Sequence, residues 1–465
     1  MRAALILLCL LQLFPAFAGE EGPTLIGVAR VPAAAVDSEG ETLGGFGSGM
    51  MLVPGSWRQT DKGYTAKVLM LPDRGWNTAG TTDFRARLQK FDVALTPDDG
   101  NPGHEDQLKL IYKGALLLTD SKGVPTTGLD PVAVRPAEGA MPDLPVAANG
   151  HVSLDDEAVA PDGKGGFWVG DEYGPTIYRY DAKGHMTGAI RPPDAFIPMR
   201  QGKENFSSNN PPLGTQYDGG NPDSGRQNNQ GFEGMSVSPD GRTLFVVNQS
   251  ALRQDLDPVD AKASRRNVRL LAYDVTGAPR LIHEYAIQLP TYQDGSKVAV
   301  AAQSELLAID DHRFLLLCRD SGGGFASKRP QSLYRKILLL DINNATDIAG
   351  RYDGATDAIA PKGILRAGIV PATLSDFIDL NDNAELARFG LHNGAPADSH
   401  DLYEKWESLA LAPAGPKGQY ILLVGSDNDF ITQDGHMAGQ PYKDSSGADV
   451  DTLVMAWRVT LDNAP

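Results

Sequence analysis

The chain alternates short apolar runs with turns rich in Gly, Pro, Asp and Asn, a pattern that predicts strands rather than helices. The clearest example spans residues 157–171. An apolar run follows Glu157, Pro161-Asp162-Gly163 supplies a turn, and a second apolar run ends at Asp171. Two strands of similar length joined by a tight turn bring their outer ends together. We therefore expect Glu157 and Asp171 to lie near each other in space.

The same hairpin pattern recurs along nearly the whole chain. Four copies begin with a glutamate, and the first copy has Ser48 in its place; the glutamates are Glu157, Glu233, Glu305 and Glu407. The second strand of each copy ends at a polar residue, and these residues are Asp73, Asp171, Asn248, Asp320 and Asp427. Repetition of one hairpin is typical of a repeat architecture, whereas a β-sandwich does not require it.

Each unit continues with a third strand and several have a fourth, so the repeat predicts an all-β protein built from four-stranded antiparallel blades, a β-propeller. The last unit runs out of chain after its third strand, while residues 24–31 have no unit of their own. We expect this N-terminal strand to complete the last blade and close the ring, which hides two sheet edges. Five repeats can be traced, and residues 115–150 leave room for a sixth blade.

The sequence also predicts a leader, one mature domain and three long insertions. Residues 1–18 combine a positive start, an apolar stretch and Ala16-Phe17-Ala18 before Gly19, which indicates a cleaved signal peptide. We expect residues 19–465 to form a single propeller domain, exported to the periplasm or the extracellular space without a stable membrane anchor. Long loops in compact folds are often functional, so we expect the insertions at the rim of a site. They lie near residues 192–230, 341–404 and 427–449, the second with a helix over 382–389.

The net charge limits which partners the protein can bind, and the cysteine content limits how it can be stabilised. The formal net charge is −17, and nucleic acids require a basic surface, so we expect no nucleic-acid partner. Cations and small neutral or metal-bridged ligands suit an acidic protein better. Cys318 is the single cysteine of the predicted mature chain, so an internal disulfide is impossible. We expect a monomer stabilised by its core, by ring closure or by bound ions.

The first strands of propeller blades line the central channel, so the glutamates are predicted to form a ring at its mouth. Crowded carboxylates repel one another unless cations lie among them. Many oxygen ligands suit Ca²⁺, with Mg²⁺ or Mn²⁺ as alternatives. The structural alternative is that the glutamates accept hydrogen bonds from backbone amides of neighbouring blades. The predicted metal ligands are Glu157, Asp171, Glu233, Glu305, Asp320, Glu407 and Asp427.

Several side chains beside these acids are candidates for substrate binding and catalysis. Arg74 and Arg319 each adjoin an aspartate, where they either neutralise it or bind an anionic group. Tyr173 is suited to stacking on a ligand or to packing between blades. We expect Arg74, Arg319, Tyr173 and Asn248 to bind substrate, and Glu233, Asp171 and Arg319 to be catalytic. The chain contains no Gly-x-Ser-x-Gly segment, so hydrolysis is expected to use metal-activated water.

Several short segments of the chain, taken together, resemble the phytase-like family, whose members are labelled "esterase-like activity of phytase". The likeness covers nearly the whole mature chain and rests on residues 44–50, 129–131, 156–157, 170–175, 231–234, 319–321, 405–408 and 426–430. It implies an exported β-propeller, distantly related to propeller phytases that use several Ca²⁺ ions to hydrolyse phytate. A more general likeness, to gluconolactonase-type propellers, would assign one divalent ion to Glu233, Asn248 and Asp427.

The sequence therefore predicts an exported, metal-binding propeller that hydrolyses phosphoesters or simple esters at the channel mouth. Its expected substrate is a small molecule. Two alternatives stay open at this point, because propellers host all three functions. One is a non-catalytic propeller that binds a glycan, a polymer or a protein, and the other is a lactonase.

Overall fold

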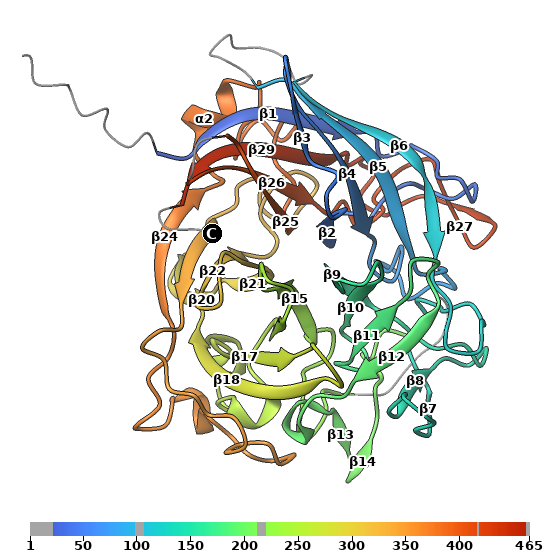
Figure 1. The fold of residues 1–465 in the computed structure, drawn as a ribbon, viewed down its shortest axis with the longest axis vertical. Coiled ribbons are helices and arrows are strands. Elements are labelled where there is room, and N and C mark those ends of the chain that lie inside the picture. Colours follow the sequence, from blue (N-terminus) through green and yellow to red (C-terminus); the bar gives the residue numbers. More distant parts are fainter. Residues whose placement is uncertain (1–21, 98–106, 212–219, 416–417, 462–465) are drawn as a thin grey trace, which may run out of the picture.

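The computed structural model describes residues 22–97, 107–211, 220–415 and 418–461. The predicted signal peptide, residues 1–18, lies outside this described part. Five antiparallel sheets are arranged around a central axis as the blades of a propeller (Figure 1). Four blades have four strands each, and blade 1 carries one additional short strand. The predicted all-β propeller is confirmed.

The strands of each blade run in order from the channel outward, apart from the added strand β3. Blade 1 consists of β2 (Gly49–Leu52), β4 (Gly63–Leu71), β5 (Arg87–Leu95) and β6 (Leu108–Leu117), with β3 (Arg58–Thr60) paired to β4. Blade 2 consists of β9 (Asp156–Pro161), β10 (Phe167–Asp171), β11 (Ile177–Tyr180) and β12 (Met186–Ile190). Blade 3 consists of β15 (Phe232–Val237), β16 (Thr243–Asn248), β17 (Asn267–Asp274) and β18 (Arg280–Gln288).

The last two blades follow the same plan. Blade 4 consists of β21 (Ala302–Ala308), β22 (Arg313–Arg319), β23 (Arg335–Asp341) and β24 (Thr373–Asp379). Blade 5 consists of β25 (Trp406–Pro413), β26 (Gln419–Ser426), β29 (Thr452–Thr460) and β1 (Thr24–Val31). The inner strands β2, β9, β15, β21 and β25 each contact the next one around the axis, and β25 contacts β2. The ring is therefore closed.

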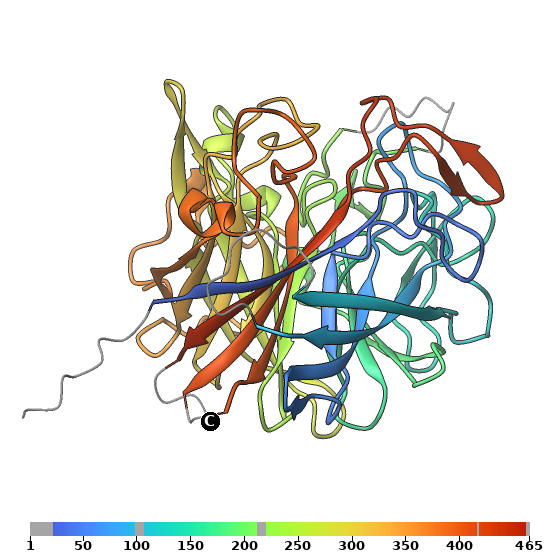
Figure 2. The same cartoon turned by 90° about the horizontal axis from the view of Figure 1, so that it is seen from above.

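The N-terminal strand completes the last blade, as the sequence predicts. β1 pairs antiparallel with β29 from Thr24 opposite Arg458 to Val31 opposite Thr452. Both views show the two strands side by side, although they come from opposite ends of the chain (Figures 1 and 2). The final blade thus combines strands from near both ends of the described chain.

One hydrophobic core lies between each pair of neighbouring blades, which explains the continuous apolar runs of the second strands. In β26, Leu422 and Val424 pack into the core shared with blade 4, whereas Ile421 and Leu423 pack into the core shared with blade 1. Successive strand residues point to opposite faces. Because both faces of each blade are covered, the middle of the strand, residues 420–424, is apolar at every position.

Residues 115–150 do not form a sixth blade. They contain the end of β6 and a short hairpin, β7 (Ala133–Arg135) and β8 (Leu144–Val146), which is a separate two-stranded sheet. The described part of the chain therefore has five blades. The surplus length that suggested a sixth is accommodated by this hairpin and by turns.

The three insertions contain short elements of their own, and part of the second lies against the outer strand of a blade. The first contains η1 (Asp194–Phe196) and the hairpin β13 (Met199–Arg200) and β14 (Lys203–Glu204), and the third contains the hairpin β27 (Gly435–Met437) and β28 (Gln440–Tyr442). In the second insertion, the backbone amide of Ile348 donates to the carbonyl of Glu284 in β18, the outermost strand of blade 3. This part of the second insertion lies at the periphery, away from the channel. The same insertion supplies β24, which the sequence pattern did not reveal.

Helices are few and short in the described residues. Besides η1, they are η2 (Arg253–Asp255), α1 (Ala261–Ser264), η3 (Pro361–Gly363) and α2 (Asn383–Ala387). One further hairpin consists of β19 (Thr291–Asp294) and β20 (Lys297–Val300). The helix expected over residues 382–389 is present as α2, and the Asp382 side chain caps it by accepting from the amide of Ala384. None of the helices has the length and apolar character needed to cross a membrane.

Candidate metal centre at the channel mouth

Backbone bulges set the direction of the glutamates at the beginning of the inner strands. In blades 2, 3 and 5 the register of the first two strands skips one residue, which is Glu157, Glu233 or Glu407. A bulge leaves this residue unpaired and re-aims its side chain. In blade 4 the skipped residue is Ser304, and Glu305 pairs with Leu317. The four glutamates are therefore not equivalent, although their sequence positions are.

Seven carboxylates form a continuous arc at this end of the channel, which we call the acidic arc. They fall into three groups, and within each group one oxygen atom from every residue lies within 4.8 Å of the others. The groups are Asp73, Asp427 and Asp429; Asp73, Asp155 and Glu157; and Glu157, Glu172 and Glu233. Asp73 and Glu157 each belong to two groups and so connect them. These buried clusters could hold a metal ion.

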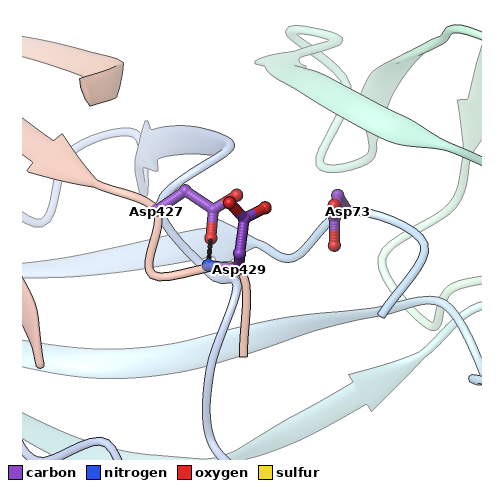
Figure 3. A group of neighbouring side chains, drawn as sticks. All are labelled: Asp73, Asp427 and Asp429. Atoms are coloured by element: carbon purple, nitrogen blue, oxygen red, sulfur yellow. Dashed lines mark hydrogen bonds between the residues drawn. The ribbon is translucent and has the colours of Figure 1, made fainter. Parts of the chain in front are cut away.

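The first group joins blade 1 to blade 5 and already contains a cation. Figure 3 shows Asp73 facing Asp427 and Asp429 across the joint, with the amide of Asp429 donating to Asp427 Oδ1 at 2.7 Å. Lys405 Nζ lies 2.6 Å from Asp429 Oδ1 and 3.6 Å from Asp427 Oδ2. These carboxylates raise the pKa of Lys405 well above its usual value, against the opposing effect of burial. The ammonium group therefore stays charged and occupies this end of the arc.

The backbone around this group is held in a left-handed conformation by one amide side chain. Asp429 and Phe430 have φ values of 50° and 55°, which non-glycine residues rarely adopt. Asn428 Oδ1 accepts from the amides of Gly45 at 2.8 Å and Phe430 at 3.2 Å, and its Nδ2 donates to the carbonyl of Val450 at 2.7 Å. Asn428 thereby fixes the loop that carries Asp427 and Asp429 to the glycine-rich start of blade 1.

Close approach of the two chain segments explains the glycines at that start. A Cβ atom on Gly47 would lie 1.9 Å from the carbonyl oxygen of Ser426, which no side chain can tolerate. The neighbouring Ser48 directs its hydroxyl to Asp427 Oδ2 at 3.4 Å. The first repeat therefore has Ser48 where the other repeats have a glutamate, and the Ser48 hydroxyl donates a hydrogen bond to Asp427 of the last repeat.

The middle group is partly neutralised by an arginine. Arg74 Nη1 lies 2.7 Å from Asp155 Oδ2, and both side chains are almost completely buried. Asp155 Oδ1 has no hydrogen-bond partner. Burial raises the pKa of Asp155 despite Arg74, and it raises the pKa of Asp73 to about 7.

The third group has no cation bonded to it in the described residues. Glu172 Oε1 accepts from the amide of Gly231 at 3.0 Å, and Glu233 Oε1 accepts from Gln249 Nε2 at 2.6 Å. The Oε2 atoms of Glu172 and Glu233 are buried and have no partner. Burial, together with the neighbouring acids, raises the pKa of Glu172 to about 8 and places those of Glu157 and Glu233 well above their usual values. These orphaned oxygens are the atoms that a divalent cation would satisfy.

Three residues predicted from the ends of second strands bond to backbone amides or to side chains other than those of the acidic arc. Asp171 accepts from the amides of Asp155 at 2.8 Å and Gly174 at 2.7 Å. Asp320 accepts from Ser332 Oγ at 2.7 Å and from Arg329 Nη2 at 2.9 Å, and Asn248 Oδ1 accepts from the amide of Arg269 at 2.9 Å. These side chains have their oxygens occupied and belong to none of the three carboxylate groups.

Four other predicted residues are also engaged elsewhere. Glu305 Oε1 accepts from the amides of Met235 at 3.1 Å and Leu306 at 2.7 Å, the backbone role that the structural alternative describes. Arg319 Nη2 bonds to Glu407, and the hydroxyl of the fully buried Tyr173 donates to the carbonyl of Gly128 at 2.8 Å. From the predicted ligand set, the structure brings Glu157, Glu233 and Asp427 into the acidic arc.

Several members of the acidic arc are absent from the predicted ligand set. Asp73, Glu172 and Asp429 stand in or beside the repeated strand ends, so the repeat contained a signal for them. Asp155 and Lys405 precede the glutamates of their blades by two residues. They are recognisable only once the bulges and the path of the preceding loop are known.

The structure thus defines a five-bladed propeller with a buried acidic site at one end of its channel. The sequence matches the phytase-like family, described as "esterase-like activity of phytase", over residues 61–430, and the chain belongs to this family. A protein of Arthroderma benhamiae named "uncharacterized secreted protein" is 41% identical over 453 residues, covering 88% of this chain and 87% of that protein.

Two solved structures also align with the chain at low similarity. Hydrazine synthase of Kuenenia stuttgartiensis has a TM-score of 0.28 and 10% identity over 91% of this chain and 68% of its own. A candidate 6-phosphogluconolactonase of Bacteroides fragilis has a TM-score of 0.26 and 11% identity over 95% of this chain and 99% of its own.

Proposed function

We propose that the protein is an exported, metal-dependent hydrolase of phosphoesters or simple esters, with its metal held by Glu157, Glu172 and Glu233. The observation that carries the proposal is the pair of buried, partnerless Oε2 atoms on Glu172 and Glu233. The family to which the chain belongs supports the ester chemistry. The name of the Arthroderma benhamiae relative supports export.

The choice among the three carboxylate groups follows from charge. Lys405 already neutralises Asp427 and Asp429, and Arg74 neutralises Asp155. The third group has the same crowding of carboxylates with no bonded cation in the described residues. Oxygen ligands in this number suit Ca²⁺ best, with Mg²⁺ and Mn²⁺ as the alternatives.

A divalent cation there would polarise the ester and lower the pKa of a water molecule. The residues of the chain would position the other components. Gly231 and Gln249 hold the Oε1 atoms of Glu172 and Glu233, which leaves their Oε2 atoms for a ligand. Asp155 Oδ1, which has no partner, is the proposed acceptor for the proton of the attacking water.

A cation at the channel mouth would bind the anionic part of a substrate. Arg74 and Arg319 stay predicted for this role, and each is already bonded to a buried carboxylate. Lys405 is the more accessible candidate, because 23% of its side chain is exposed. We propose that Lys405 faces the substrate while it holds Asp429. Asp171 would act as a positioning residue, because backbone amides occupy both of its oxygens.

The test is hydrolysis of nitrophenyl phosphate, nitrophenyl acetate and phytate by the chelator-treated protein, before and after addition of Ca²⁺, Mg²⁺ or Mn²⁺. We expect turnover of at least one ester that requires the metal and is lost in Glu233→Gln. Metal binding without turnover on any of these esters would reject the hydrolase and favour a non-catalytic binding propeller. Turnover confined to sugar lactones would assign the protein to the lactonase alternative.

A further inference from the structure

Beneath the acidic arc, the channel changes from acidic to apolar. A cavity of about 300 Å³ is lined by the five inner strands and the turns that follow them. Met50, Val159, Met235 and Leu409 contribute to this lining, each two residues after the serine or glutamate at the beginning of its strand. Two residues of a strand span about 7 Å, so the apolar lining begins directly below the carboxylates.

The cavity reaches solvent at the opposite face of the propeller. Its lining extends to Pro161, the last residue of β9, and to Tyr420 near the beginning of β26. Leu52, Pro161, Leu411 and Tyr420 are partly exposed, whereas Met50, Val159, Met235 and Leu409 are buried. The cavity is therefore open at the end away from the acidic arc.

The lining includes only three side chains with polar atoms: Ser236, Glu305 and Tyr420. Ser236 Oγ accepts from the amide of Ala308 at 2.9 Å. The amides of Met235 and Leu306 both donate to Glu305 Oε1, so Oε2 is the atom available to a ligand. Burial raises the pKa of Glu305 well above its usual value, so an uncharged carboxyl group is favoured inside this apolar space.

The offset in blade 4 places Glu305 in the cavity. Because Ser304 occupies the bulge, the glutamate lies one residue further along β21 than its counterparts in the other blades. An apolar cavity with few hydrogen-bonding groups typically binds an apolar ligand and orients its polar end. The volume lies at the lower end of the range of about 300–1,000 Å³ for small-molecule pockets.

We propose that this cavity binds an uncharged amphiphile, a medium-length alkyl chain with a hydroxyl or carbonyl head that hydrogen-bonds to Glu305. The ligand enters from the face opposite the acidic arc. This site is independent of the proposed metal-dependent hydrolysis. Its occupancy is expected to be the same with and without a chelator, so the failure of either proposal leaves the other intact.

The test uses the mature chain and the neutral fluorophore N-phenylnaphthylamine, with decanol as the competitor. We expect saturable fluorescence enhancement that decanol reverses. Leu411→Trp and Leu52→Trp place a large ring at the open end and should weaken binding of the fluorophore at least tenfold. Val370→Trp is the matched control, because Val370 is 51% exposed and lies outside the cavity. Equal binding by all three folded variants, or no saturable binding by the wild type, would overturn the proposal.

The head-group contact has its own test. Glu305→Ala should weaken decanol binding about tenfold, the effect of one lost hydrogen bond in an apolar site. Glu305→Gln keeps an acceptor for the two backbone amides and a donor for the ligand, so it should retain decanol affinity within about threefold. Stronger displacement by decyltrimethylammonium than by decanol would indicate an ionised Glu305 and would contradict the neutral ligand.

Discussion

The two ends of the acidic arc are both built from carboxylates, aspartates at one end and glutamates at the other, but they differ in their cations. At the Asp427–Asp429 end, Lys405 lies 2.6 Å from one carboxylate and has Asp73 among its neighbours. At the Glu172–Glu233 end, two carboxylate oxygens are buried without partners. One end is therefore complete with the protein's own charge, while the other requires an ion or protons. Counting acids cannot distinguish these ends, because the difference lies in a single lysine from the preceding loop.

Replacing Lys405 should produce the largest loss in the free energy of unfolding. Lys405→Met leaves the buried Asp427 and the half-buried Asp429 without a cation, and removing one partner of a buried pair typically costs about 3–5 kcal/mol. We expect a loss of this size in the free energy of unfolding, measured by chemical denaturation in chelator. Lys336→Met is the control, because Lys336 forms a surface pair with Asp376 and should cost at most about 1 kcal/mol. Equal losses in the two variants would show that Lys405 does not neutralise the arc.

At the other end, Glu233→Gln should remove a metal ligand. We expect Ca²⁺ affinity, measured by calorimetry, to fall roughly 100-fold, since even residues that support ligands contribute about 10–100-fold. Asp429→Asn is the matched control at the Lys405 end and should change Ca²⁺ affinity by less than about fivefold. The reverse ranking would place the ion beside Asp73, Asp427 and Asp429.

A substitution at Asn428 should have a smaller effect, and it should change stability without changing metal binding. Asn428→Ala removes one buried acceptor and one buried donor at the joint between blades 1 and 5. We expect a loss of about 2 kcal/mol in the free energy of unfolding, with Ca²⁺ affinity nearly unchanged. Ca²⁺ affinity reduced as strongly as in Glu233→Gln would mean that the two ends of the arc act as one site.

Much of the fold is predictable because a repeated hairpin specifies both strand pairing and blade order. The completion of blade 5 by residues 24–31 follows from counting strands. The site is less predictable, because the position of a bulge decides which of two neighbouring residues is left out of the strand pairing. In blade 4 this residue is Ser304 and not Glu305. Burial decides the rest: Asp171 is occupied by backbone amides, whereas the adjacent Glu172 keeps a partnerless oxygen. Neither distinction is visible in composition or spacing.

The most direct measurement is a crystal structure of the protein soaked in Mn²⁺, with the ion located by its anomalous scattering. We predict an ion coordinated by Glu157, Glu172 and Glu233, and none between Asp73, Asp427 and Asp429. An ion bound beside Lys405, or an acidic arc that stays free of metal at saturating Mn²⁺, would contradict it.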